Sequence, residues 1–161
     1  MAMCYVPDGH GVAHALMGMT ATLTVADAPA ERTRATAPVQ GTIELAHGGY
    51  RFPKAMPAGW YHVVNTDEGD AGSGLHELSL MRLGEPLSDP KATRVVAALA
   101  ANRDPGVALE AVGGMGARSP GFDGYVHLDL DHDPHLAVDF MPDPGEPRPH
   151  MLDGYHATVT P

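Results

Sequence analysis

Cys4, His14 and Met19 lie close together near the start of the sequence, in residues 3–25 (MCYVPDGHGVAHALMGMTATLTV). A thiolate, an imidazole and a thioether are soft ligands that suit copper. We therefore interpret this segment as a candidate copper loop. The alternative is that Cys4 acts as a small hydrophobic residue and that Met19 is a packing residue.

Residues 138–160 (VDFMPDPGEPRPHMLDGYHATVT) repeat this pattern with a loop that is one residue longer. The matched pairs are Pro7 with Pro142, Asp8 with Asp143, His14 with His150, Leu16 with Leu152, Gly18 with Gly154 and Ala21-Thr22 with Ala157-Thr158. The second copy keeps the histidine, but it has Asp139 in place of Cys4 and Tyr155 in place of Met19. One copy therefore has a soft donor set, and the other lacks both sulfur ligands.

The segments between the two copies have mostly the patterns of strands and turns. Apolar and β-branched runs predict strands, because such side chains fit a half-buried pleated surface. The predicted strands are residues 39–52 (one or two strands with a Gly48-Gly49 turn), 59–65, 75–83, 124–130, 136–141 and 156–160, and residues 20–25 add a strand to the opening hairpin. Residues 66–74 and the glycine-rich residues 111–124 are predicted loops.

One helix is predicted for residues 88–102, which Ser88 or Asp89 can cap and in which Pro90 lies near the first turn. Seven or eight strands with a single inserted helix indicate an all-β fold, an antiparallel β-sandwich of Greek-key type. We expect residues 1–25 to form an extra terminal hairpin, residues 26–38 a linker and residues 39–161 the main domain.

The order of these motifs resembles the cupredoxin family. The resemblance rests on PAGWYHVVN, LHELSL, the helix, and VDFMPDPGEPRPHMLDG before a final strand, and it covers roughly residues 38–161. It implies a cupredoxin-like Greek-key β-sandwich in which His76 is the upstream histidine ligand and His150 the loop histidine. Asp139 and Tyr155 then stand where the family has its cysteine and methionine ligands, so the closing copy alone cannot form a blue copper centre.

Three functional hypotheses follow from these residues. In the first, Cys4, His14 and Met19 meet His76 in a composite copper site for electron transfer or copper carriage. In the second, His76, His150 and Asp139 form a hard-ligand site for non-haem iron, zinc or copper(II). These residues would serve a small biosynthetic enzyme, with or without the metal, in which His76, His150, Asp139 and Tyr155 are catalytic candidates and His127 or His156 is a further acid or base.

In the third hypothesis the domain has lost its metal and works as a ligand-binding or interaction module. Its pocket would lie at one end of the sandwich, lined by Trp60, Tyr125 and residues 111–124. The histidines of the acidic run 127–135 (HLDLDHDPH) are interpreted as part of a solvated turn rather than a cation site. Copper is thus the cofactor that the sequence favours, with no cofactor as an equal alternative.

Composition excludes several partners. The formal net charge of −10 argues against nucleic acids and anionic membranes. A single cysteine excludes an intramolecular disulfide, and the sequence has no secretory leader pattern. We expect a soluble protein, cytoplasmic as the chain stands and exported if a leader was removed. An isolated hairpin is marginally stable and exposed strand edges pair readily, so we also expect homo-oligomers through hairpin or edge-strand pairing.

Overall fold

The computed structural model describes residues 2–3, 12, 14–24, 38–68, 74–143 and 145–161. The chain divides into two compact units, Met1–Thr36 and Ala37–Pro161, and each is described by itself. Most of the linker predicted for residues 26–38 lies outside the described residues. No helix in the described part of the chain is long and apolar enough to cross a membrane.

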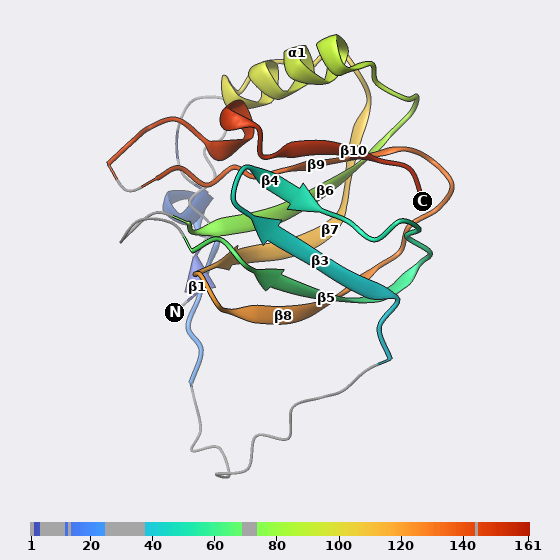
Figure 1. Ribbon diagram of the computed structural model, residues 1–161. Helices are drawn as coiled ribbons and strands as arrows, with labels where there is room; N and C mark the ends of the chain where they lie inside the picture. The colour runs from blue at the N-terminus through green and yellow to red at the C-terminus, as the bar shows by residue number, and fades with distance from the viewer. Residues whose placement is uncertain (1, 4–11, 13, 25–37, 69–73, 144) are drawn as a thin grey trace. The chain divides into compact units, whose positions relative to one another are not determined.

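The larger unit is a sandwich of two four-stranded sheets (Figure 1). One sheet has the order β10-β9-β6-β7 and the other the order β4-β3-β5-β8. The strands of the first sheet are β6 (His76–Leu83), β7 (Leu109–Arg118), β9 (His135–Val138) and β10 (His156–Val159). Those of the second are β3 (Gly41–Ala46), β4 (Gly49–Arg51), β5 (Gly59–Asn65) and β8 (Asp123–Leu128). The all-β sandwich expected from the sequence is therefore the observed fold.

The pairing of β3 with β5 is parallel, which corrects the expectation of a wholly antiparallel sandwich. Gly41 pairs with Tyr61 and Leu45 with Asn65 in this register. The cause is the turn at Gly48-Gly49, which folds β4 back along one edge of β3. The chain must then cross to the other edge of β3 before β5 begins, and such a crossover makes two strands parallel.

The main core lies between the two sheets and follows the period-two pattern of β5 and β6. In β5, Tyr61 and Val63 are fully buried, and in β6, Leu78 and Leu80 are equally enclosed. The same alternation places His76 on the inner face of β6, where it is 2 % exposed. The strand pattern thus carries an ionisable side chain into the interior at one end of the sandwich.

A single helix, α1 (Asp89–Ala100), covers the outer face of the β9 region. Proline occupies the first turn, as the sequence predicted, and Ser88 has the extended backbone of an N-cap, although its side chain makes no capping hydrogen bond. The buried face of α1 packs with residues of β6, β9 and the 3-10 helix η2 (His150–Asp153) in a second apolar cluster, formed by Leu83, Leu87, Ala92, Val95, Val96, Leu136, Val138 and Met151. All four residues of β9 are consequently buried.

The glycine-rich residues 111–124 are not a loop, which corrects the sequence interpretation. Most of them belong to β7, paired along β6 with a register irregularity between Leu80 and Met81. Gly114 has φ +150°, and a Cβ added there would lie 1.9 Å from the carbonyl oxygen of Leu78. Glycine is therefore required by close backbone approach at an irregular strand pair, rather than by chain flexibility.

The smaller unit contains a short hairpin. Its strands are β1 (Ala2–Met3) and β2 (Thr20–Ala21), and the 3-10 helix η1 (His14–Met17) precedes β2. The strand predicted for residues 20–25 is thus only two residues long. Thr20 and Ala21 are both exposed, so no packing against a sheet extends the pairing.

Candidate metal centre

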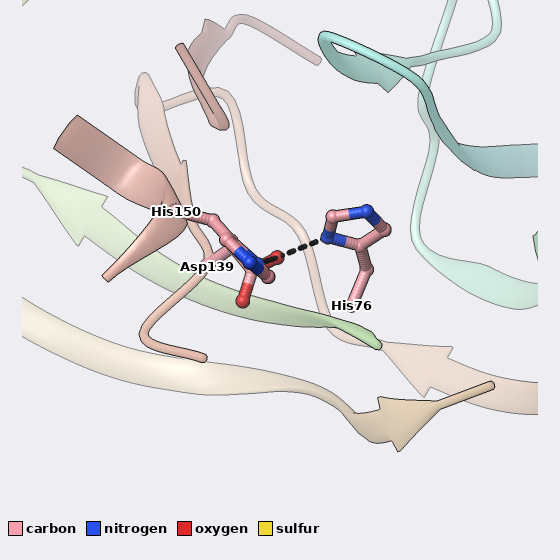
Figure 2. Close-up of side chains that lie close together, drawn as sticks. All are labelled: His76, Asp139 and His150. Atoms are coloured by element: carbon pink, nitrogen blue, oxygen red, sulfur yellow. Dashed lines mark hydrogen bonds and ion pairs between the residues drawn. The ribbon is translucent and has the colours of Figure 1, made fainter. Parts of the chain in front are cut away.

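Three side chains from separate elements meet at one end of the sandwich. His76 is the first residue of β6, Asp139 follows β9 directly, and His150 begins η2. One potential ligand atom from each lies within 4.8 Å of the other two, and all three residues are buried. Figure 2 shows the imidazole of His76 directed at the Asp139 carboxylate, with His150 beside Asp139. The structure thus brings together the hard-ligand set named from the sequence.

Both imidazoles present the same ring atom to one carboxylate oxygen. Nδ1 of His76 lies 2.7 Å from Oδ2 of Asp139, and Nδ1 of His150 lies 3.1 Å from the same oxygen. The other oxygen of Asp139 accepts a hydrogen bond from the backbone N–H of Met141 at 2.8 Å. The two Nδ1 atoms and Oδ2 therefore converge on a common point.

The outer nitrogen of each imidazole faces a second carboxylate. Nε2 of His76 lies 2.9 Å from Oδ2 of Asp67, and Nε2 of His150 lies 3.2 Å from Oδ1 of Asp143. Carboxylates in this position orient metal-binding histidines and make the inner nitrogen more basic. The arrangement fixes both rings with Nδ1 directed inward.

Asp67 was missed by the sequence analysis, which placed it in a loop. Asn65 at the end of β5 determines its position: the side-chain oxygen of Asn65 accepts the backbone N–H of Asp67 at 2.9 Å. The amide nitrogen of Asn65 donates to the carbonyls of Gly74 and Arg118 at 2.5 and 2.7 Å. The available signal was the sequence Asn65-Thr66-Asp67, an acidic residue two positions after the end of the strand predicted for residues 59–65.

Tyr155 closes the remaining side of the cluster. Its hydroxyl donates to Oδ2 of Asp67 at 3.1 Å and accepts the backbone N–H of Gly48 at 3.0 Å. Its ring contacts the imidazoles of both His76 and His150. Tyr155 thereby links the closing hairpin to the turn between β3 and β4.

Backbone hydrogen bonds hold the segment that carries Asp139, His150 and Tyr155. The N–H of Asp139 donates to the carbonyl of Tyr155 at 3.1 Å, and the N–H of Met151 donates to the carbonyl of Asp139 at 2.9 Å. The N–H of Tyr155 donates to the carbonyl of His150 at 3.2 Å. Gly154, at φ +103°, makes the left-handed turn that ends η2. The cluster is therefore preorganised by local geometry.

The electrostatics of the cluster favour a charged His76. Burial alone would lower the pKa of His76, but hydrogen bonds to Asp139 and Asp67, together with their charges, raise it above the usual value. The pKa of Tyr155 is also raised, first by burial and then by the same two carboxylates. His76, which lies between Asp67 and Asp139, therefore holds a proton more firmly than an unperturbed histidine does.

Other candidate residues lie elsewhere. His127 packs edge-on against Trp60 with ring centroids 5.4 Å apart, and Tyr125 stacks on His62 at 5.1 Å, all on β5 and β8. Residues 111–118 belong to β7 rather than to a glycine loop, and the pocket expected beside Trp60 and Tyr125 stays a prediction. Nδ1 of His156 bonds to the carbonyl of Met151 at 2.8 Å instead of entering the cluster.

The soft-ligand prediction falls mainly on the smaller unit. Cys4 lies outside the described residues. His14 begins η1, and Met19 follows that helix with a side chain 57 % exposed. The composite site of Cys4, His14, Met19 and His76 stays a prediction.

Comparison with solved structures finds two auracyanins of low sequence identity. The reduced auracyanin of the photosynthetic bacterium Roseiflexus castenholzii is 13 % identical, with 78 % of this chain and 98 % of that chain covered and a TM-score of 0.46. Auracyanin B is 17 % identical, with coverages of 78 % and 91 % and a TM-score of 0.39. Comparison with protein-family models gives no match, and neither does comparison with curated protein sequences.

Proposed function

We propose that this protein binds a divalent metal ion, preferentially copper(II), through Nδ1 of His76, Nδ1 of His150 and the carboxylate of Asp139. The observation that carries the proposal is the convergence of both Nδ1 atoms on one oxygen of Asp139 in a buried position. The outer carboxylates of Asp67 and Asp143 support it, because they hold both rings in the orientation that a metal requires.

The chemistry of the donors favours copper(II) over other ions. Two imidazoles and a carboxylate are borderline and hard ligands, and at such a set copper(II) has the highest affinity of the common divalent ions. The set contains no thiolate or thioether, the ligands that stabilise copper(I). We therefore expect the ion to be held firmly in the oxidised state, which suits storage or carriage better than rapid electron exchange.

Burial argues for metal binding without catalysis at this site. The exposed fractions are 0 % for Asp139, 2 % for His76, 4 % for Asp67, 5 % for His150 and 8 % for Tyr155. A substrate would have no direct approach to an ion held there. The enzyme alternative, with His76, His150, Asp139 and Tyr155 in catalytic roles, would require this end of the sandwich to rearrange.

The experiment is a titration of metal-free protein with copper(II), followed by calorimetry, visible absorption and electron spin resonance. We expect one equivalent to bind with weak d–d absorption and with nitrogen hyperfine coupling in the resonance spectrum. Asp139→Asn and His150→Gln should each weaken binding by more than about tenfold, since loss of a supporting group alone commonly costs that much. Asp67→Asn, which alters a positioning residue, should weaken binding by roughly 10- to 100-fold.

Two control variants separate this site from other copper ligands. His132→Gln changes an exposed histidine outside the cluster, and Cys4→Ser removes the only thiol of the chain. Neither should alter the affinity of the site. Binding that is insensitive to Asp139→Asn would refute binding at this site. An absence of stoichiometric binding would refute the proposal as a whole and would favour the metal-free interaction module.

A second candidate is a soft copper site on the opening hairpin, formed by Cys4, His14 and Met19. The N–H of Met19 donates to the carbonyl of His14 at 2.9 Å, the same bond that joins Tyr155 to His150 in the closing hairpin. This shared local geometry favours the candidate. An intense charge-transfer band near about 600 nm that Cys4→Ser abolishes would support it, and weak absorption alone would exclude it.

A further inference from the structure

The opening and closing hairpins have the same strand register. Met3 pairs with Thr20 and Ala2 with Ala21 in the opening hairpin. Val138 pairs with His156 and Ala137 with Ala157 in the closing hairpin. Under the sequence alignment given above, these are the same two pairs of positions.

The turn before the second strand is also the same in both hairpins. Each begins with a histidine that opens a four-residue 3-10 helix, η1 or η2. Each then has a glycine with positive φ, +95° at Gly18 and +103° at Gly154. The next hydrogen bond is 2.8 Å long in both hairpins. It joins the N–H of Thr20 to the carbonyl of Gly18 in the opening hairpin and the N–H of His156 to the carbonyl of Gly154 in the closing one.

The two hairpins differ in what covers their apolar residues. Tyr155 and Val159 of the closing hairpin are each 8 % exposed, and Leu152 packs in the cluster beneath α1. The equivalent residues of the opening hairpin are uncovered: Met19 is 57 % exposed, Leu23 is 64 % exposed and Leu16 is 83 % exposed. Within the described residues, the opening hairpin thus has the register, the turn and the apolar positions of the closing one, and these apolar side chains are exposed.

The closing hairpin shows what those partners must be. β9 pairs with β10 on one edge and with β6 on the other, and η2 packs against α1. Four paired residues in two short strands do not make a hairpin that is stable alone in water. Since β1 corresponds to β9 and Leu16 to Leu152, a packed opening hairpin would need a strand paired with the open edge of β1 and a helix in contact with Leu16.

We propose that the opening hairpin is a docking element that completes another β-sandwich of this architecture, one that lacks its own closing hairpin. The partner would offer a strand equivalent to β6 with one free edge and a helix equivalent to α1. A second copy of this chain does not offer this, because its β6 is already paired with β7 and β9. The proposal is independent of metal binding at His76.

The first test uses the larger unit as a stand-in for the partner. In the full chain, residues 138–160 are replaced by a second copy of residues 3–25. We expect the variant to unfold cooperatively and the grafted amides equivalent to Met19 and Thr20 to exchange hydrogen at least about 100-fold more slowly than those of the native opening hairpin. A matched graft with serine at the positions of Leu16, Met19 and Leu23 should lose that protection.

A smaller graft, with residues 14–19 in place of residues 150–155, allows for a failure of the larger one to fold. If both grafts unfold the chain, or if the grafted hairpin stays unprotected in a folded chain, the proposal is wrong.

Hydrogen exchange on the unaltered protein is an independent test of the proposal. We expect the amides of Met19 and Thr20 to exchange within about tenfold of the unstructured rate, and those of Tyr155 and His156 much more slowly. Equal protection in both hairpins would also overturn the proposal.

Discussion

The ring of Tyr155 lies flat on the imidazole of His76, with centroids 4.2 Å apart and an angle of 19° between the planes. The same tyrosine hydroxyl bonds to Asp67, which in turn bonds to Nε2 of His76. Where the opening hairpin has Met19, the closing hairpin thus has an aromatic ring that covers the histidine. The substitution removes a potential sulfur ligand and closes the cluster with packing and hydrogen bonds.

Tyr155→Phe should keep the stacking but remove the hydroxyl that serves both Asp67 and Gly48. Because the buried Asp67 carboxylate and the exposed N–H of Gly48 each lose a hydrogen-bond partner, we expect the free energy of unfolding to fall by about 1–3 kcal/mol. The measurement is chemical denaturation of metal-free protein. Tyr125→Phe, on the outer face of β8, is the matched control, and we expect it to change stability by less than about 0.5 kcal/mol. Equal effects of the two variants would contradict the role given to the Tyr155 hydroxyl.

The raised pKa of His76 makes the stability of the metal-free protein depend on pH. The folded chain holds this proton more tightly than the unfolded chain, so the stabilisation is complete below the unfolded pKa of about 6.5. It is lost as pH rises through the higher folded pKa. We expect proton resonances of the His76 ring to titrate at a pH above that of an unperturbed histidine. A titration at or below the ordinary value would contradict the raised pKa of His76.

Gly114→Ala should be strongly destabilising, because the new Cβ would meet the Leu78 carbonyl at 1.9 Å and φ is +150°. We expect a loss above about 3 kcal/mol, the range in which strain and overpacking act together. Gly116→Ala, two residues along β7 and with no atom within 4 Å of the new Cβ, is the control. It should change stability by less than about 1 kcal/mol. Thermal unfolding of both variants decides the matter, and similar melting temperatures would argue against a close approach at Gly114.

His135 should make the protein less stable in acid. Its side chain is fully buried, and neither ring nitrogen makes a hydrogen bond within the described part of the chain. Burial lowers its pKa, an effect that nearby Asp131 only partly opposes. The unfolded chain therefore binds the proton more readily, and stability is lost as pH falls from about 6.5 towards the folded pKa.

His135→Leu should remove part of this acid sensitivity and raise stability by about 1 kcal/mol, because an unsatisfied buried ring is replaced by an apolar side chain. Denaturation curves at two pH values, about 7.5 and 5.5, provide the measurement. If His135→Leu leaves the difference in the free energy of unfolding between the two pH values unchanged, the acid sensitivity belongs to other groups. His132→Leu, at an exposed neighbouring position, is the control.

The sequence predicted those elements whose patterns depend on local chemistry. The strand at residues 59–65 and the helix after Ser88 were both identified, because side-chain alternation and a proline in the first helical turn are local signals. The glycine-rich strand β7 was not, because the need for glycine at Gly114 is explained only by the approach of the Leu78 carbonyl from another strand. The parallel pairing of β3 with β5 was missed for the same reason, since it depends on the path of the chain around β4.

The cluster was partly predictable. His76, Asp139 and His150 were named because each occupies a position in a recognisable motif. Asp67 was not, since its role depends on the end of β5 lying beside the start of β6 and on the bond from its N–H to Asn65. Sequence motifs thus located the inner side chains, and only the folded arrangement revealed the carboxylates that orient them.

The cluster joins groups that the ribosome makes at very different times. Asp67 and His76 belong to the middle of the chain, whereas Asp139, the second carboxylate on His76, is made 63 residues after that histidine. When β6 has just been synthesised, His76 on its inner face does not yet have the negative charge of Asp139 beside it. Because domains generally fold as units during synthesis, this end of the sandwich closes only once residues 139–155 have emerged. Translation itself therefore sets the earliest moment at which His76, Asp139 and His150 can come together.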